Sequence, residues 1–230
     1  MLRVVIVLIF FQAVFLHVNQ IGSWHRDDIL VLLAVYFTIE SLIIITFHRN
    51  LAYYFPSYVR KGSFDHYLTK PIPVLPHVAF RVVDLMDTIS TLPVGVLWAY
   101  LLATGTVHLT VASSTLFVLS GLLAIVFTFG LSTIVAAISF WSISQTGLGR
   151  LYEQLFRTGR YPTDALGSSQ GFLFTYILPF ITVGTLPASA LNHLIEPTTL
   201  AGVALSVLVF ALLARMLWRR GLRRYSSASS

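Results

Sequence analysis

A series of long apolar runs constrains this chain more than any other feature. A helix that crosses a membrane needs about 20 predominantly apolar residues, because the hydrocarbon core is about 30 Å thick. The chain of 230 residues offers six such runs, at residues 2–18, 29–47, 85–107, 111–141, 171–191 and 200–218. They predict an all-α membrane protein with about six transmembrane helices, in which residues 1–230 form a single transmembrane domain. The first run also has the length of a signal peptide, but Asn19 and Gln20 make a poor cleavage site, so we expect it to remain as a span.

Composition supports the same class of protein. Hydrophobic residues make up 56% of the chain and charged residues 10%, whereas soluble domains contain about 25% charged residues. Such a chain cannot cover itself with a polar surface, so its solvent must be largely lipid. Six spans and their connections leave no room for a soluble catalytic domain. The absence of cysteine excludes disulfides, thiolate nucleophiles and cysteine-based metal sites.

Lys and Arg residues are distributed unevenly among the segments that connect these runs. Residues 48–84 carry five of them, residues 142–170 carry three, and the C-terminal end from Arg215 onward carries five, while Arg26 stands alone in the other connections. Cytoplasmic loops are enriched in Lys and Arg, so we expect cytoplasmic loops at 48–84 and 142–170 and both termini in the cytoplasm. This topology explains the net charge of +6, and we expect no nucleic-acid partner.

The loop at 48–84 contains signals for two short helices. Pro56 suits the first turn of a helix over Pro56–Lys61, because its missing N–H costs nothing there. Gly62 suits the position after the helix end, where φ is positive. A second helix over Phe64–Thr69 is ended by Pro71. We therefore expect a compact element that faces the cytoplasm; the alternative is an interfacial loop anchored by its tyrosines.

The loop at 142–170 contains an amphipathic pattern. Apolar residues recur at the i, i+3, i+4, i+7 and i+8 spacing that marks one face of a helix. The opposite face carries Glu153 and Arg157 at the favourable i, i+4 spacing. We expect either an interfacial helix in the headgroup plane or a structural helix packed on the underside of the bundle. The residues of the apolar face are Leu148, Leu151, Tyr152, Leu155 and Phe156.

Glu40 is the one ionisable side chain deep inside a predicted span. Ionisable groups at this depth cost about 2.5–3.5 kcal/mol on insertion scales, so they face a partner or a water-filled path. Glu40 is therefore either a residue of a translocation pathway or a helix-pairing residue that contacts a neighbouring hydroxyl or Arg. The chain carries no phosphate-binding loop, no zinc-protease motif and no histidines at ligand spacing. We expect no catalytic residues, no metal site and no cofactor bound by this chain.

The segment from Gly62 to Ile72, which reads GSFDHYLTKPI, resembles the G-x-x-D-x-x-L-x-[KR]-P-[IL] segment between the second and third helices of ABC-2-type exporter permeases. The basic stretch from Arg219 onward is followed by Tyr-Ser-Ser-Ala, as in a poorly characterised branch of that family. Similar residues also occur in order along nearly the whole chain, at Phe140-Trp141, Arg160-Tyr161-Pro162 and Leu186-Pro187-Ala188.

This resemblance implies a six-helix half-transporter in a bacterial-type cytoplasmic (inner) membrane. By similarity, the chain would form the translocation pathway of an exporter as a dimer with a second permease chain, which is either the same or a paralogue. ATP and Mg²⁺ would be bound by a separate cytoplasmic ABC ATPase subunit, so this chain would not itself be an enzyme, and membrane lipid would be its other partner. The ATPase-coupling loop carried over from the motif comprises Gly62, Asp65, Leu68, Lys70 and Pro71.

Two points qualify what the resemblance implies. Family members usually begin with an amphipathic cytoplasmic helix, whereas here Arg3 is followed at once by lipid-compatible residues. We therefore expect either a misassigned start or a shortened member. The alternative function is a gradient-driven secondary transporter or channel subunit, which normally needs several intramembrane charges or inverted repeats.

Overall fold

Helices account for nearly all the regular structure of the chain. The computed structural model describes residues 2–83, 89, 91–107, 109–142, 146–192 and 195–225. Within those residues, the one β pairing is an isolated bridge between Ile21 and Trp24, in the turn that follows the first helix. The all-α membrane architecture expected from the apolar runs is therefore present in this part of the chain.

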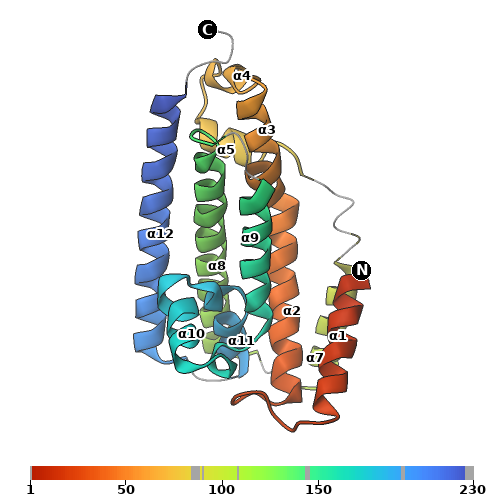
Figure 1. Cartoon of the computed structure of the whole chain (residues 1–230). Helices are drawn as coiled ribbons and strands as arrows, with labels where there is room; N and C mark the ends of the chain where they lie inside the picture. The colour runs from red at the N-terminus through yellow and green to blue at the C-terminus, as the bar shows by residue number, and fades with distance from the viewer. Residues whose placement is uncertain are drawn as a thin grey trace.

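Three long apolar helices form the body of the molecule and lie side by side (Figure 1). They are α2 (Arg26–Ile43), α8 (Val111–Ile138) and α12 (Pro197–Arg224). Each is long and apolar enough to cross a membrane. The candidate span that begins with α2 extends from Arg26 to His48. Two shorter apolar helices, α1 (Leu2–Phe15) and α7 (Leu92–Ala103), pack against α2. The described residues thus contain three clear candidate spans, and the two shorter helices cover parts of the first and third runs.

The second helix does not stop where its apolar run ends. It continues through two π-helical segments, η1 (Ile44–His48) and η2 (Asn50–Tyr54), into α3 (Phe55–Arg60). Arg49 between them keeps helical dihedral angles, so the helical path is continuous from Arg26 to Arg60. The Asn50 side-chain amide lies 2.8 Å from the carbonyl oxygens of Ala79 and Val82, which fastens the later part of this loop to the π-helical section.

The amphipathic helix α9 (Thr146–Phe156) runs antiparallel to this long helix. Phe156 packs on Tyr36, Tyr152 stacks on His48 and Gly149 lies beside the ring of Tyr53, so the partners follow each other in opposite order along the two helices. The Tyr53 hydroxyl also donates to Glu153. The structure therefore corrects the expectation of a helix in the headgroup plane or on the underside of the bundle. The apolar face of α9 is covered by the long helix, and its axis follows the bundle (Figure 1).

The segment after α9 leads to the end of the bundle opposite α3. There Asp164 Oδ2 accepts hydrogen bonds from the backbone N–H of Ser23 at 2.9 Å and from its hydroxyl at 2.5 Å. The expectation had put residues 142–170 and the turn around Ser23 on opposite sides of the membrane. Two groups in direct contact cannot lie on opposite sides, so the sides expected for these two segments cannot both be right.

The fifth apolar run is not one continuous span. It folds as a broken chain of short helices, because Pro179 lacks a backbone donor and disfavours helical angles at the residue before it. Leu178 accordingly leaves the helical region, at φ −123° and ψ 79°. This segment packs against α2 and α8 through its last helix. Its parts, with the preceding turns, are η3 (Arg157–Arg160), η4 (Thr163–Ala165), α10 (Ser168–Phe172), η5 (Leu173–Ile177), η6 (Phe180–Val183) and α11 (Thr185–Asn192).

Candidate functional site

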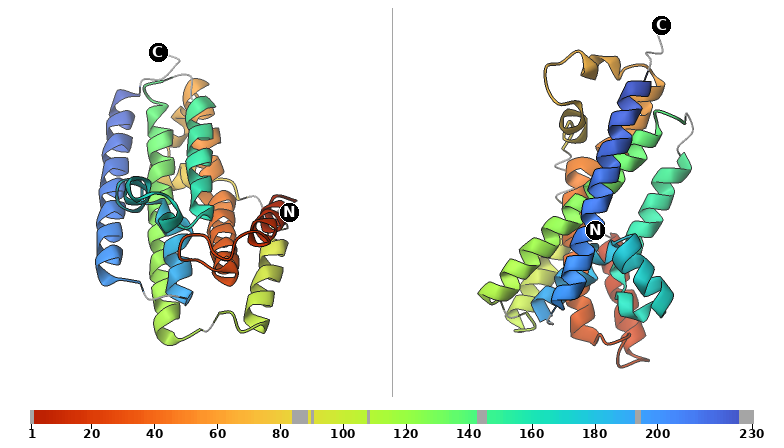
Figure 2. Two further views of the ribbon diagram at one scale, coloured as in Figure 1. Left: turned by 60° about the horizontal axis from the view of Figure 1, so that its bottom comes forward. Right: turned by 90° about the vertical axis from the view of Figure 1, so that its left-hand side faces the viewer.

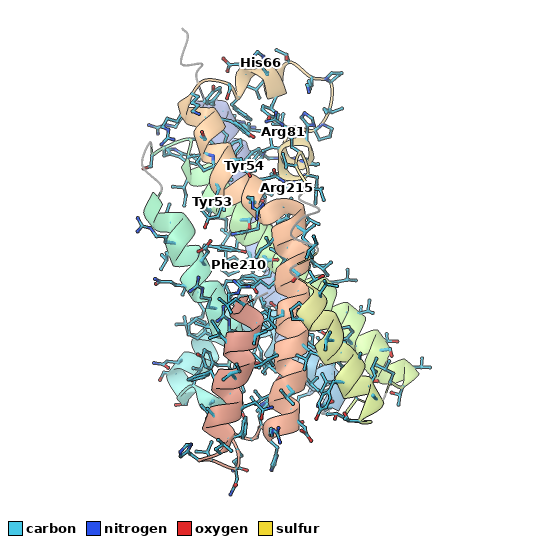
Figure 3. The ribbon with its side chains drawn as sticks, turned by 90° about the vertical axis from the view of Figure 1, so that its right-hand side faces the viewer. Tyr53, Tyr54, His66, Arg81, Phe210 and Arg215 are labelled. Atoms are coloured by element: carbon cyan, nitrogen blue, oxygen red, sulfur yellow. The ribbon has the colours of Figure 1, made fainter. Side chains whose placement is uncertain are left out.

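The segment from Gly62 to Pro71, here called the 62–71 element, lies at the end of the bundle where the long helix stops. The two short helices expected there are present as α3 and as α4 (Asp65–Leu68), and α5 (Val74–Ala79) follows them. Gly62 joins α3 to α4 with φ at +72°, which only glycine adopts without cost. Figure 3 shows His66 at the outer tip of the molecule and Arg81 closer to the bundle.

An aromatic cluster fixes the element to the ends of three helices. The Phe64 ring is fully buried, and its centroid lies 5.1 Å from that of Phe55, 5.7 Å from that of Phe140 and 5.1 Å from that of Tyr225. Trp218 completes the cluster, 5.0 Å from Phe55. These rings come from α3, from the end of α8 and from the end of α12. Each such ring pair contributes about 0.5–1.5 kcal/mol beyond simple burial, so the element and the helix ends are held as one unit.

Asp65 and Tyr225 add a polar contact to this cluster. Burial, followed by the neighbouring Asp65 carboxylate, raises the pKa of Tyr225 to about 12. The Tyr225 hydroxyl therefore stays neutral at any physiological pH and lies close to the Asp65 carboxylate. The motif residue Asp65 is thus directed toward the C-terminal end of α12.

A second set of contacts holds the inner side of the element. The rings of Tyr58 and Tyr67 stack with centroids 5.5 Å apart. The Arg81 guanidinium lies 5.2 Å from the first ring and 5.4 Å from the second. A cavity of about 340 Å³ opens beside them, and Lys70 Nζ at its edge lies 3.3 Å from His77 Nε2.

The remaining side chains of the element point outward. Leu68 is 45% exposed, and His66, Lys70 and Pro71 are exposed as well. Of the coupling-loop residues expected from the sequence, Leu68, Lys70 and Pro71 therefore form an accessible surface. Gly62 and Asp65 instead shape and anchor the element. The accessible side chains carry positive charge and no negative charge, which makes this a surface for an acidic or neutral partner.

Glu40 lies in a different place, in the middle of the bundle, and is only 4% exposed. Its carboxylate forms an ion pair with Arg3 of α1 and accepts a hydrogen bond of 3.0 Å from the Tyr36 hydroxyl. A second cation, Arg160, lies 5.4 Å from the centre of the Tyr36 ring. Glu40 therefore has both partners that a helix-pairing role requires, an Arg and a hydroxyl.

A small polar cavity of about 120 Å³ adjoins this ion pair. Two cations and two carboxylates line it, together with His48 and apolar residues from α2 and α9. Charged side chains at membrane depth usually pair with one another or face a water-filled space, and here Arg3 and Glu40 pair at the edge of a cavity. The four charged residues are Arg3, Glu40, Glu153 and Arg157.

The five residues expected on the apolar face of α9 do not all face inward. Tyr152 and Phe156 are buried, and Leu148 and Leu155 are partly buried against the core. Leu151, however, is exposed. Four of the five thus pack into the core, Tyr152 and Phe156 against the long helix, and Leu151 lies on the exposed side of α9.

Two sets of important residues were missed by sequence reasoning. Phe64 and Tyr67 occupy positions that the motif leaves open, although two aromatic residues three apart beside a glycine turn are a signal for an anchored element. Arg3 was placed at the cytoplasmic end as a topology signal, and nothing in its local sequence indicates that it pairs with Glu40.

The described side chains suit the binding of a partner and a conformational change better than they suit catalysis. Among the residues that the structure describes, no group of three His, Cys, Asp or Glu side chains could hold a metal ion. A buried charge cluster lies inside the bundle, and an anchored element with an exposed basic face lies at one end. A long helix connects the two.

Comparison with known proteins assigns the chain to a family. A family model described as ABC-2 family transporter protein matches residues 1–229. Neither the search of curated proteins nor the search of solved structures found a match.

Proposed function

The chain belongs to the ABC-2 family of transporter proteins, and on this premise we propose that it is the permease subunit of an ATP-driven exporter. In this proposal two permease chains, identical or paralogous, form the translocation pathway in a bacterial-type inner membrane. A separate cytoplasmic ATPase binds ATP and Mg²⁺. Six membrane crossings with both termini in the cytoplasm are part of the proposal.

The observation that carries the proposal is the anchoring of the 62–71 element. A partner that pushes on Leu68, Lys70 and Pro71 would push on a unit that includes the ends of α3, α8 and α12. Because α3 continues the long helix, such a push reaches the interior of the bundle without passing through a loose loop. Rigid-body movement of this kind is a known way to couple a distant event to a conformational change.

The electrostatics of the element favour an acidic docking surface on the ATPase. Lys70 is exposed, and His66 of the same element is exposed as well. Complementary charges guide association, and like charges placed opposite each other cost several kcal/mol. A charge reversal at Lys70 is therefore expected to weaken docking much more than it disturbs folding.

The test uses the tagged full chain isolated from the membranes of its own cells in mild detergent. The wild-type isolate is expected to hydrolyse ATP, and Lys70→Glu is expected to lower that activity about tenfold at unchanged amounts of chain. Lys61→Glu is the matched control, because Lys61 is an exposed lysine at the same end, just outside the 62–71 element. Its activity should stay close to that of the wild type.

The two parts of the proposal can fail separately. A wild-type isolate without any ATPase activity would contradict the proposal that the chain belongs to an ATP-driven exporter. An active isolate in which Lys70→Glu and Lys61→Glu behave alike would keep the exporter and reject the docking surface.

One observation favours the alternative, a gradient-driven transporter or channel subunit. The polar cavity beside Glu40 holds four charged side chains, and gradient-driven carriers depend on such groups. In that case the isolated chain alone, reconstituted in vesicles, would move substrate in response to an imposed ion gradient and would need no ATPase.

A further inference from the structure

An apolar groove of about 800 Å³ is lined by residues of α2, α8 and α12 and by Leu75 of α5. The helices α5 and α9 lie on opposite sides of the bundle (Figure 2). The floor of the groove is buried and includes Phe47, Thr133 and Ala214. Its rim is exposed and includes Leu42 and Val126. The groove therefore opens sideways, toward whatever surrounds the bundle at the level of the apolar helices.

The groove offers one charge and almost no other polar group. Of its fourteen lining residues, Arg215 is the only charged one. The hydroxyls of Thr46 and Thr133 donate to carbonyl oxygens of their own helices, at 2.6 Å and 2.8 Å. An occupant must therefore be apolar along most of its length and negatively charged at the end that meets Arg215.

Arg215 is also the first of a row of arginines. Arg219 and Arg223 follow it at intervals of four residues, and together with Arg220 they line an adjoining depression of about 460 Å³. Like charges at this spacing repel each other, and α12 contains no acidic residue. No hydrogen bond or ion pair joins the Arg215 guanidinium to another described side chain. The cationic row thus lacks a counter-charge from within the described chain.

We propose that this groove and the adjoining arginines bind an anionic phospholipid of the cytoplasmic leaflet. An acyl chain would lie along Phe47, Phe129 and Val126, where van der Waals contacts with these side chains replace contacts with other lipid tails. The phosphate would meet Arg215 and Arg219, whose guanidinium groups suit bidentate phosphate binding. Basic pockets between membrane helices on the cytoplasmic side are suited to anionic headgroups. The proposal does not depend on the ATPase partner.

A second copy of the chain fits this face less well. Two copies side by side in one membrane would be related by a twofold axis along the membrane normal, so each face would meet itself. The arginine row of one copy would then face the arginine row of the other, which is unfavourable. A transported amphiphile has the same chemistry as a lipid, but the open rim exposes the groove to the bilayer, where lipid is always present.

The test exploits the absence of cysteine from the chain. Val126→Cys places a single thiol at the rim of the groove, where a fluorophore can be attached. The labelled full chain is reconstituted in vesicles that contain either brominated phosphatidylglycerol or brominated phosphatidylcholine, and bromine quenches a fluorophore that it contacts. We expect about tenfold tighter apparent binding of the anionic lipid, from the charge-assisted hydrogen bonds to Arg215.

Two substitutions on α12 distinguish lipid binding in the groove from a general effect of positive charge on this helix. Arg215→Gln should abolish the preference for phosphatidylglycerol. Arg224→Gln removes the same charge from the same helix but lies outside both depressions, so the preference should remain. Arg215→Lys keeps the charge without the bidentate geometry and should retain part of the preference, which guards against a misfolded glutamine variant.

Three results would overturn the proposal. The first is equal quenching by the two lipids, or a preference that survives Arg215→Gln. The second is an efficient disulfide between two unlabelled Val126→Cys chains in the membrane, which would assign the face to a second copy. The third is loss of the bound anionic lipid during ATP turnover of the isolated complex, which would assign the groove to transported substrate.

Discussion

At the scale of single residues, the partly buried ion pair between Arg3 and Glu40 joins α1 to α2. Breaking a buried pair by removing one partner leaves an uncompensated charge, which costs more than losing both. Glu40 is enclosed, whereas the Arg3 side chain is 46% exposed. The two partners are therefore not equivalent, and the loss of the cation should be the worse of the two.

Arg3→Met is expected to lower the stability of the chain by about 1–2 kcal/mol, a value reduced for the exposure of Arg3. Glu40→Gln should cost less, because a neutral amide can still accept the hydrogen bond from Tyr36. The double variant should be more stable than Arg3→Met alone. Thermal unfolding of the purified chain in detergent measures all three.

Additive losses in the double variant would contradict this account, because they would mean that the two side chains do not interact. Arg26→Met serves as a control, since Arg26 is exposed and its hydrogen bond goes to the exposed Gln12.

At the scale of elements, the broken segment after α9 depends on close contact between two backbones. Gly184, between η6 and α11, lies so near η3 that a Cβ atom there would sit 2.0 Å from the carbonyl oxygen of Gly159. Real Cβ atoms do not approach an oxygen so closely, and backbone atoms cannot rotate away. The contact joins the end of α9 to α11 and so closes the end of the bundle opposite the 62–71 element.

Gly184→Ala should therefore destabilise the chain strongly, by roughly 2–4 kcal/mol, through forced separation of η3 from η6. Gly95→Ala is the matched control. Gly95 lies inside α7, and a Cβ atom there would meet nothing within 4 Å, so alanine should be neutral or slightly stabilising. The melting temperatures of the two variants in detergent test this, and similar values would contradict the close contact.

Local signals in the sequence predicted the elements that local chemistry determines. Pro56 and Gly62 place α3, its end and the turn into α4 within one or two residues. The apolar pattern of α9 identified its buried face, but periodicity says nothing about what covers a face. Whether lipid headgroups or the long helix cover Tyr152 depends on residues about a hundred positions away. Arg160 was counted as a loop charge, although it lies over the ring of Tyr36 in the bundle.

At the scale of the whole molecule, the two ends of the bundle are chemically distinct. One end carries the 62–71 element and the arginines of α12. The other carries the contact between Ser23 and Asp164, with α10 nearby. If the apolar helices cross a membrane, these two ends face opposite compartments, and the topology can be measured directly.

Single cysteines in this cysteine-free chain test that topology with a membrane-impermeant maleimide. Ser23→Cys and Ser168→Cys should be labelled from one side, and Thr69→Cys from the other, in sealed vesicles of known orientation. Ser132→Cys, whose site is fully buried between helices, should stay unlabelled until the protein is unfolded. Labelling of Ser168→Cys and Thr69→Cys from the same side would contradict the position of α9 in the bundle.

The unbroken helical path from Arg26 to Arg60 can transmit movement between the 62–71 element and the interior of the bundle. At about 1.5 Å per residue, Arg60 lies some 30 Å along this helix from Glu40. A helix of that length can carry a movement from one end of the bundle to its interior. The π-helical turns at 44–54 interrupt the regular α-helical hydrogen bonding, so we expect the helix to bend there most easily. A small displacement of α3 would thus tilt the part of the helix that lines the cavity beside Glu40. Replacing the π-helical turns by regular α-helix would change the size of that tilt.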